Sequence, residues 1–326
     1  MGDVLLTAPV MCGALEANPD LQIDFVTKEN YSGYFAGIER LNVISAFTDK
    51  KHKGVLGLMR LSSEIMKGVK PDLVIDLHEV IRSRVLRYFY ALRRIPVYRI
   101  NKGRNEKRAY IKVRKRNILK HTTERYRDVF KQAGIDAPLI NFPFSLTPAL
   151  HKPAATKIIK LGLAPFARHQ AKSWPVEYIR KLMDLLIANI DIRFFFYGSK
   201  EDAVKLKELD FGKLKVINNA GVLTPGEEVK SISKLDIFLS MDSANMHLAD
   251  LIGIPVISIW GGTHPDLGFR PLNQPDNHSV QTSETLPCRP CSVYGNKPCS
   301  LKESKYKCLH SISPEIVASK ILSSIS

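Results

Sequence analysis

The stretch FLSMDSANMHLADLIGIPVISIWGGTHP, residues 238–265, decides the fold class of this chain. Its first apolar run predicts a buried strand that ends at Asp242, and SANMHLADLIG predicts a helix that ends at Gly253. IPVISIWGG then predicts a second buried strand. A strand, a helix and a strand in this order are typical of a parallel sheet covered by helices.

The same alternation extends along the chain on both sides of this stretch. In the C-terminal half, we expect strands in KIIKLGLAPF, IRFFFYG and LKVINNAG, with helices in VEYIRKLMDLLIANI, EDAVKLKEL and GEEVKSISKL. In the N-terminal half, strands in LQIDFVT and PDLVIDLH surround a helix from Gly54 to Val69, and helices follow in RSRVLRYFYALRR and HTTERYRDVFKQAG. The segment NFPFSLTPALHKP has no helical or strand period and is interpreted as a linker.

The sequence therefore predicts an α/β protein of two domains, residues 1–147 and 148–326, each with a parallel sheet. Ligands of such sheets bind at the carboxyl ends of the strands, so we expect the site in a cleft between the domains.

Composition is that of a globular protein, with 326 residues, 44% of them apolar and 25% charged. No apolar run approaches the roughly 18 residues needed to span a bilayer. No basic start followed by an apolar core indicates a signal peptide, so we expect a cytoplasmic protein.

The net charge of +16 is concentrated in one segment. Between Arg82 and Lys120 there are fifteen Lys and Arg residues and one acid, Glu106. A solvated helical face would explain a scattered run of charges, but a block this dense favours a polyanionic partner or an anionic membrane surface. Composition alone leaves nucleic acid, anionic lipid and acidic sugar as alternatives.

Small residues follow both strands of the deciding stretch. Ser243 and Ala244 open a helix, with His247 one turn further on, and the free N–H groups of a helix start suit an anion. Alternatively, Asp242 or Ser243 is only an N-cap. Gly261 and Gly262, followed by Thr263, would expose backbone N–H groups to a phosphate. Two such loops at one sheet edge favour a site for a nucleotide diphosphate.

A third loop carries positive charge. In LAPFARHQAKSWPVEYI, a strand is followed by Arg168, His169 and Lys172, and Trp-Pro then begins a helix. Three potential cations this close together fit a phosphate contact. A solvated loop is the alternative interpretation.

The ordered set of motifs resembles the lipopolysaccharide heptosyltransferases, glycosyltransferase family 9. The motifs are G-D-V-L-L-T-x-P, A-P-F-A-x-x-x-x-K-x-W-P, M-D-S-A-N-M-H-L-A, I-W-G-G-T-H-P and a C-x-x-C cluster, and they extend over essentially the whole chain. The resemblance implies the GT-B fold, in which two Rossmann-like domains face each other across a cleft. It also implies inverting transfer of a heptose from ADP-heptose to the lipopolysaccharide inner core, without a catalytic metal or other cofactor.

Several residues acquire roles from the matching motifs. The resemblance implies that Asp3 is the general base that takes the proton of the acceptor hydroxyl. It implies that Lys172 neutralises the donor diphosphate, and that Asp242 contacts the donor sugar. Other residues would bind the donor: Ser243, Ala244 and His247 around the phosphates, Glu201 near the nucleoside, and Gly261, Gly262 and Thr263 in the next loop.

Two positions depart from the family pattern. Ala167 and Arg168 stand where some relatives have hydroxyl residues, so Arg168 would replace a hydroxyl contact to the donor with a charge. His264 stands where many relatives have an acid.

The resemblance also implies a role for the basic segment, because the N-terminal domain of the family receives the acceptor. The inner core of lipopolysaccharide carries carboxylates and phosphates, which would attract Arg82 and Arg84. His78, at the end of a strand, would line the acceptor site, although a lone histidine is more often structural. The same segment would hold the protein at the inner face of the cytoplasmic membrane.

Four of the five cysteines cluster near the C-terminus, at positions 288, 291, 299 and 308. A structural metal, reduced thiols packing a loop, and disulfides are all open for this cluster. Cys12, in the first helix, is expected to be a core residue. No neighbouring base indicates a catalytic thiol.

The chain opens with MGDVLLTAPV, so Gly2 and Asp3 form a strand-to-helix turn with no strand before it. In the family an apolar strand precedes this turn. We therefore expect a truncated chain in which the first strand of the N-terminal domain is missing and its neighbours lack backbone partners. A version extended upstream would then be more stable and more active. A natural short form with a rearranged sheet is the alternative.

Two other functions and an inactive form are alternatives to heptose transfer. A GT-B enzyme with another ADP-, UDP- or GDP-sugar donor would have the same fold. A non-catalytic basic protein that binds polyanions such as nucleic acid would explain the charge, but the basic segment lacks regularly interleaved aromatics and any nucleic-acid module signature. An inactive family member is disfavoured because Asp3, Lys172 and Asp242 are all present.

Overall fold

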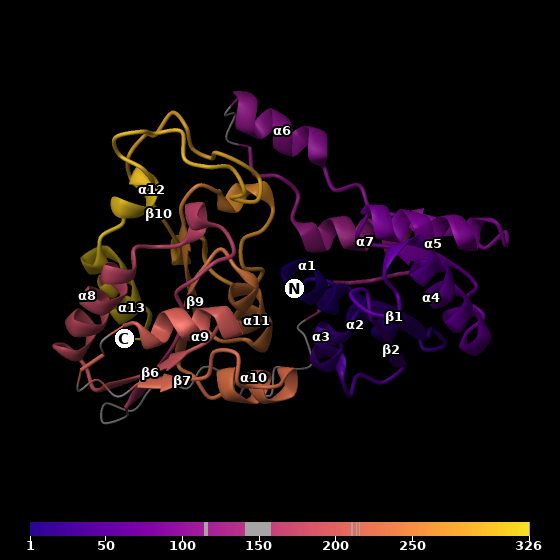
Figure 1. Cartoon of the computed structure of the whole chain (residues 1–326), viewed down its shortest axis with the longest axis horizontal. Helices are drawn as coiled ribbons and strands as arrows, with labels where there is room; N and C mark the ends of the chain where they lie inside the picture. Colours follow the sequence, from indigo (N-terminus) through magenta and orange to yellow (C-terminus); the bar gives the residue numbers. More distant parts are fainter. Residues whose placement is uncertain (114–116, 141–157, 210, 213, 215, 326) are drawn as a thin grey trace. The chain divides into compact units, whose positions relative to one another are not determined.

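The computed structural model describes residues 1–113, 117–140, 158–209, 211–212, 214 and 216–325 (Figure 1). Two compact units are present. The first contains Asp3–Arg104 and the chain from Lys120 to Pro143, and the second contains Asn105–Leu119 and the chain from Phe144 onward. The predicted linker and the predicted boundary at 147/148 lie outside the described residues. Domains at 1–147 and 148–326 therefore stay a prediction.

The second unit is built on a six-stranded parallel sheet with the order β10-β9-β8-β5-β6-β7. Its strands are β5 (Ile159–Ala164), β6 (Ile192–Phe196), β7 (Val216–Asn218), β8 (Ile237–Met241), β9 (Val256–Trp260) and β10 (Ser279–Gln281). β8 and β9 are buried along their whole length, as expected for continuous apolar runs at the centre of a parallel sheet.

Helices cover this sheet because their apolar residues recur at helical spacing. In α8 (Val176–Ile187) the buried positions are Ile179, Leu182, Met183 and Leu186, and α8 packs beside α13 (Pro314–Ile325) (Figure 1). The other helices are α9 (Lys200–Lys207), α10 (Pro225–Ile232), α11 (Ala244–Ile252) and α12 (Lys307–His310), with short 3-10 turns η2 (Gln170–Lys172), η3 (Pro265–Leu267) and η4 (Asp276–His278).

The strand order reverses between β5 and β8, which are direct neighbours in the sheet. From β5 the chain moves outward through β6 and β7, returns to β8, and then moves outward in the other direction. The loops that follow β5 and β8 therefore leave the same edge of the sheet side by side. Such a switch point is where open α/β sheets form their ligand sites.

The first unit has two separate parallel pairs of strands where one sheet was expected. β1 (Ile23–Lys28) pairs with β2 (Leu41–Ala46), and β3 (Val74–Asp76) pairs with β4 (Val97–Arg99). Within the described residues, each of these four strands has one strand partner.

The helices of the first unit pack on these strands. They are α1 (Gly2–Leu5), α2 (Ala8–Ala17), α3 (Glu29–Ser32), α4 (Gly54–Gly68), α5 (Ile81–Ala91) and α7 (Thr122–Gln132), with the 3-10 turn η1 (Gly33–Phe35). α4 and α5 lie side by side, and Leu58, Leu61 and Ile65 of α4 share one core with Tyr90 of α5 (Figure 1). Cys12 is buried in α2, which confirms it as a core residue.

Part of the basic segment packs with the second unit, which the sequence did not indicate. Helix α6 (Arg104–Val113) contributes Tyr110, whose hydroxyl donates to Oδ2 of Asp266 (3.1 Å) and lies 3.2 Å from Nδ1 of His264. Lys107, only 4% exposed, has its ammonium 4.0 Å from the ring centroid of Phe269. His264, which stands where an acid was expected, thus belongs to a contact with α6.

Among the described residues, none of the helices combines the length and apolar character that crossing a membrane requires.

Gly13 gives a test of the packing in the first unit. A Cβ at this position would lie 1.7 Å from the backbone oxygen of Pro138, because the chain after α7 runs against α2. Gly13→Ala should therefore destabilise the protein by about 1–3 kcal/mol. The control is Gly68→Ala in α4, where a Cβ meets no atom within 4 Å, and which should be neutral or stabilise by up to about 1 kcal/mol. Urea unfolding measures both, and equal effects would contradict this packing.

Candidate functional site

The loop after β5 holds Lys172 at the switch point of the second unit. Lys172 ends the 3-10 turn η2, and the following Ser173 closes the loop by donating its hydroxyl to the carbonyl of Ala167 (3.4 Å). Trp174 anchors the far end, since its indole N–H donates to the carbonyl of Ile312 (2.9 Å). The lysine is thus presented from a loop that is fixed at both ends.

The loops after β8 and β9 supply the partners of this lysine. The ammonium of Lys172 lies 2.7 Å from Oδ2 of Asp242, and the two side chains are 15% and 8% exposed. The hydroxyl of Thr263 donates to the same carboxylate oxygen (2.8 Å). Three residues predicted for donor binding, which leave three neighbouring strands, therefore meet at one point.

The interpretation of Asp242 or Ser243 as a simple N-cap does not hold for the side chains. Ser243 occupies the N-cap position of α11, but its side chain makes no capping hydrogen bond. Its hydroxyl lies 3.0 Å from that of Ser240. Because the Asp242 carboxylate is engaged with Lys172 and Thr263, no side-chain cap occupies the start of α11. This arrangement is suited to an anionic ligand. Ala244 and His247 follow in the first turns of this helix.

The glycine loop after β9 has a different role from the one expected. The N–H of Gly262 donates to the carbonyl of Ala171 (2.7 Å), so in this structure it is not directed to a phosphate. A Cβ on Gly261 would lie 2.6 Å from the same carbonyl oxygen. The absence of side chains therefore lets the β9 loop approach the Lys172 loop closely.

The glycine loop and Lys172 are also held by residues of the cysteine-rich segment that the sequence did not single out. Arg289 donates through Nε to the carbonyl of Gly261 (2.7 Å), and the N–H of Cys291 donates to the carbonyl of Gly262 (2.8 Å). Gly295, in the left-handed region with φ 73°, packs on the aliphatic part of Lys172, where a Cβ would lie 2.7 Å from Cγ. A glycine in a cysteine-rich loop carried no sequence signal for this contact.

Two predicted donor residues stand apart from this cluster. Arg168 is exposed in the Lys172 loop. Glu201 is exposed in the first turn of α9, where a hydrogen bond from Ser199 lowers the pKa of its carboxyl. Among the described residues, no hydrogen bond or ion pair joins Glu201 to Lys172 or Asp242.

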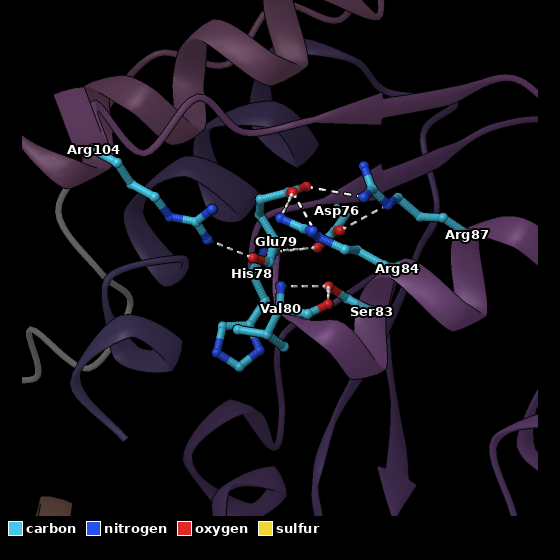
Figure 2. A network of polar contacts seen from close by, with 8 residues as sticks. All are labelled: Asp76, His78, Glu79, Val80, Ser83, Arg84, Arg87 and Arg104. Carbon is cyan, nitrogen blue, oxygen red and sulfur yellow. Dashed lines mark hydrogen bonds and ion pairs between the residues drawn. The ribbon is translucent and has the colours of Figure 1, made fainter. Parts of the chain in front are cut away.

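In the first unit, a network of acids and arginines follows β3 (Figure 2). Asp76 ends the strand and accepts from the backbone N–H groups of His78 (2.8 Å) and Glu79 (2.9 Å). Glu79 is in the left-handed region with φ 46°. Arg87 lies between the two acids, with Nε 3.1 Å from Oδ2 of Asp76 and Nη2 3.0 Å from Oε2 of Glu79. Arg104 donates to the carbonyl of Glu79 (2.8 Å). These contacts fix the turn that carries His78.

His78 is turned away from this network (Figure 2). Burial lowers the pKa of His78, Lys102 lowers it further, and the charge of Asp3 opposes the shift. Burial likewise lowers the pKa of Lys102, against the influence of Asp3. The structure thus brings Asp3, His78 and Lys102 within electrostatic reach of one another. Lys102 was not singled out, because nothing distinguishes it within the basic segment.

The remaining predicted residues of the first unit differ in their surroundings. Asp3 lies in the first turn of α1 with its side chain exposed, and its backbone carbonyl accepts from the hydroxyl of Tyr126 (3.0 Å). Arg82 is exposed on α5. Arg84 is also on α5, but its guanidinium lies 2.8 Å from Oε1 of Glu79. That contact occupies part of its hydrogen-bonding capacity.

All five cysteines are free thiols in this structure. Burial raises the pKa of Cys291 to about 12 and that of Cys308 to about 11, and neighbouring cysteines add to both shifts. The N–H of Tyr306 donates to Sγ of Cys299 (3.2 Å). The described residues contain no group of three or more His, Cys, Asp or Glu side chains placed to hold a metal ion.

The lowered pKa of His78 predicts a pH dependence of stability. The unfolded chain binds the proton near the ordinary pKa of 6.5, and the folded protein binds it only at lower pH. Stability should therefore fall as the pH drops below about 6.5. His78→Gln should make this fall shallower. The measurement is thermal unfolding at pH values between 5 and 8, spaced by about one unit. His310→Gln, at an exposed position, is the control, and an unchanged profile for His78→Gln would contradict the assignment.

Comparisons with known proteins identify the family of this chain. The model of the family described as "Glycosyltransferase family 9 (heptosyltransferase)" matches residues 59–300. Lipopolysaccharide heptosyltransferase 1 of Pseudomonas aeruginosa is 24% identical over 352 residues, covering 98% of this chain and 94% of the relative. Lipooligosaccharide heptosyltransferase 2 of Campylobacter jejuni is 29% identical over 165 residues, 48% of each protein.

Solved structures show the same fold. A glycosyltransferase family 9 protein from Veillonella parvula has a TM-score of 0.74 and 18% identity, covering 99% of this chain and 94% of that one. The Escherichia coli heptosyltransferase WaaC, solved with ADP, has a TM-score of 0.69 and 20% identity, covering 99% and 96%. The expected α/β fold of the GT-B class is confirmed. Because the family model matches well over half of its residues, the chain belongs to glycosyltransferase family 9, the heptosyltransferases, and is a glycosyltransferase.

Proposed function

We propose that this protein transfers a heptose from ADP-heptose to the lipopolysaccharide inner core, with inversion at the anomeric carbon and without a catalytic metal. The observation that carries the proposal is the cluster of Lys172, Asp242 and Thr263 at the switch point of the second unit. In this cluster a cation and an acid lie next to the start of α11. Relatives named as lipopolysaccharide heptosyltransferases, and a relative solved with ADP, support the choice of acceptor and donor.

On the donor side, the ammonium of Lys172 neutralises the diphosphate and then the departing ADP. In this structure the charge is balanced by Asp242, 2.7 Å away. Binding of a diphosphate gives Lys172 a second anionic partner, and Asp242 can then accept hydrogen bonds from sugar hydroxyls. Ser243, Ala244 and His247 lie where the N–H groups of α11 meet the phosphates.

The outer donor contacts follow from the same placement. Arg168 is exposed in the Lys172 loop and adds a second cation for the phosphates. Glu201 lies at the start of α9 and contacts the nucleoside. Thr263 holds the Asp242 carboxylate in place through its hydroxyl. Gly261 and Gly262 act through close packing of the two loops.

On the acceptor side, Asp3 removes the proton of the acceptor hydroxyl while that oxygen attacks the anomeric carbon. The bond from this carbon to the ADP oxygen breaks in the same displacement, so the configuration inverts and ADP leaves with the negative charge. His78, Arg82 and Arg84 bind the anionic acceptor. Lys102 adds positive charge in the neighbourhood of Asp3.

The proposed acceptor also indicates where in the cell the protein works. An acceptor that is part of a membrane lipid requires the protein to work at a membrane surface. We place it in the cytoplasm, in peripheral contact with the inner face of the cytoplasmic membrane. The excess of cations between Arg82 and Lys120 is suited to anionic headgroups.

Nucleotide binding tests the donor side. Calorimetric titration with ADP, UDP and GDP should give selective binding of ADP. Lys172→Ala should weaken it about tenfold or more, since a charged hydrogen-bond partner of the diphosphate is lost. The control is Lys234→Ala, an exposed lysine of the second unit, which should bind as the parent does. Preference for UDP or GDP would replace the donor with another nucleotide-sugar.

Turnover tests the acceptor side. With ADP-heptose and a lipopolysaccharide core acceptor, Asp3→Asn should lower kcat about 10²–10⁴-fold and leave ADP affinity unchanged. Asp20→Asn, an exposed acid of the first unit, is the control. The anomeric configuration of the product, read by NMR, should be opposite to that of the donor. Unchanged kcat in Asp3→Asn would remove Asp3 as the base, and retained configuration would overturn the single displacement.

A further inference from the structure

The network after β3 fixes the orientation of helix α5 about its own axis (Figure 2). Arg87 of α5 ion-pairs with Asp76 and Glu79, and its side chain is 15% exposed. At the start of the helix, the N–H of Val80 donates to the hydroxyl of Ser83 (3.0 Å). Tyr90 is buried in the core shared with α4. These contacts determine which face of α5 points outward.

The outward face of α5 is apolar. Ile81, Tyr88 and Leu92 are 80%, 62% and 63% exposed. Their spacings of seven and four residues place them on one stripe of the helix, opposite Tyr90. A solvated helix would carry polar side chains on this stripe. A helix with an apolar outer stripe and flanking cations is typical of segments that lie at a membrane interface.

Helix α4 packs beside α5 and also exposes apolar side chains. Val55, Leu56 and Met59, near its start, are also exposed, while Leu58 and Leu61 face the core shared with α5. Six of the fourteen large apolar side chains exposed in the described part of the chain therefore lie on α4 and at α5. Such a concentration exceeds the scattered exposure that is normal for a protein surface.

The charges around this face decide between possible occupants. Arg82, Arg93 and Arg94 are exposed at α5 or directly after it, within the segment that holds fifteen cations and one acid. A second copy of the chain would bring this excess of positive charge against itself. An anionic bilayer offers headgroups to the guanidinium groups and an apolar interior to Ile81, Tyr88 and Leu92.

We propose that the face formed by Val55, Leu56 and Met59 of α4 and by Ile81, Tyr88 and Leu92 at α5, the α4–α5 face, docks on an anionic lipid bilayer. Its apolar side chains enter the boundary between headgroups and acyl chains, and the neighbouring arginines contact the headgroups. The proposal deepens the membrane contact proposed above and rests on it, but it is independent of the donor and of the chemistry.

Vesicle binding by the 326-residue chain tests the proposal. Co-sedimentation is measured with vesicles of phosphatidylcholine alone and with vesicles that also contain phosphatidylglycerol. The parent should bind the anionic vesicles and lose affinity as salt is added. The triple variant Ile81→Gln, Tyr88→Gln, Leu92→Gln should bind them about tenfold or more weakly, because it loses apolar side chains that would leave water.

Matched variants separate the contributions. Val222→Gln changes an equally exposed apolar residue of the second unit and should bind as the parent does. The pair Arg93→Gln, Arg94→Gln should weaken binding and reduce its salt dependence. The pair Val55→Gln, Leu56→Gln tests α4 separately. Circular dichroism and thermal unfolding verify that each variant is folded, and the α4 pair keeps the test decisive if the triple variant unfolds.

Three results would overturn the proposal. The first is parent-like binding to anionic vesicles by folded variants of both helices. The second is equal binding of the parent to neutral and anionic vesicles. The third is self-association of the parent that the triple variant loses, because the occupant would then be a second copy. Transfer to a soluble, delipidated acceptor should be unchanged in the triple variant. This assay distinguishes failure of docking from failure of the proposed reaction.

Discussion

The ion pair between Lys172 and Asp242 depends on the order of strands in the second unit. The two residues are far apart in the sequence, and they meet because β5 and β8 are neighbours at the point where the strand order reverses. Thr263 joins them because β9 is the next strand outward. One topological reversal therefore positions a cation, an acid and a hydroxyl, and it does so through strands that are buried and rigid.

In the first unit, the turn that carries His78 is fixed by charged side chains rather than by strand order. β3 has only three residues, and the chain after it turns through a left-handed Glu79. Such a conformation costs free energy in a non-glycine residue and persists only where its surroundings enforce it. Here Arg84, Arg87 and Arg104 enforce it through Glu79 itself. Two of these arginines, Arg84 and Arg87, belong to α5, so the direction of His78 and the rotation of that helix have one common cause.

How much of this was predictable varied with the length and burial of each element. The strands β8 and β9 and the helix α11 were predicted closely, because long apolar runs ended by Asp242 and Gly253 leave few alternatives. β4 and β10 have three residues each, too few for any period to be recognised, and they were not predicted. β2 was also missed.

The individual donor residues followed from the family resemblance, but their contacts did not. That Lys172 pairs with Asp242 depends on strand order, which local periodicity does not contain. The Gly261–Gly262 loop was expected to offer its N–H groups to a phosphate, whereas Gly262 donates to Ala171. That contact depends on two loops from different strands. In the sequence Arg87 is one of fifteen cations of the basic segment, and its acidic partners are recognised only once the turn at Glu79 is known.

Ion pairing and burial of some cations weaken the long-range attraction of the basic segment for anions. Asp76 and Glu79 neutralise Arg84 and Arg87, and Lys107 lies over Phe269 with little access to solvent. The number of counterions that the segment can release on meeting a polyanion is therefore smaller than its sequence suggests. The effective charge of the segment is that of the arginines and lysines that remain in water. These residues determine the ionic strength up to which the attraction persists.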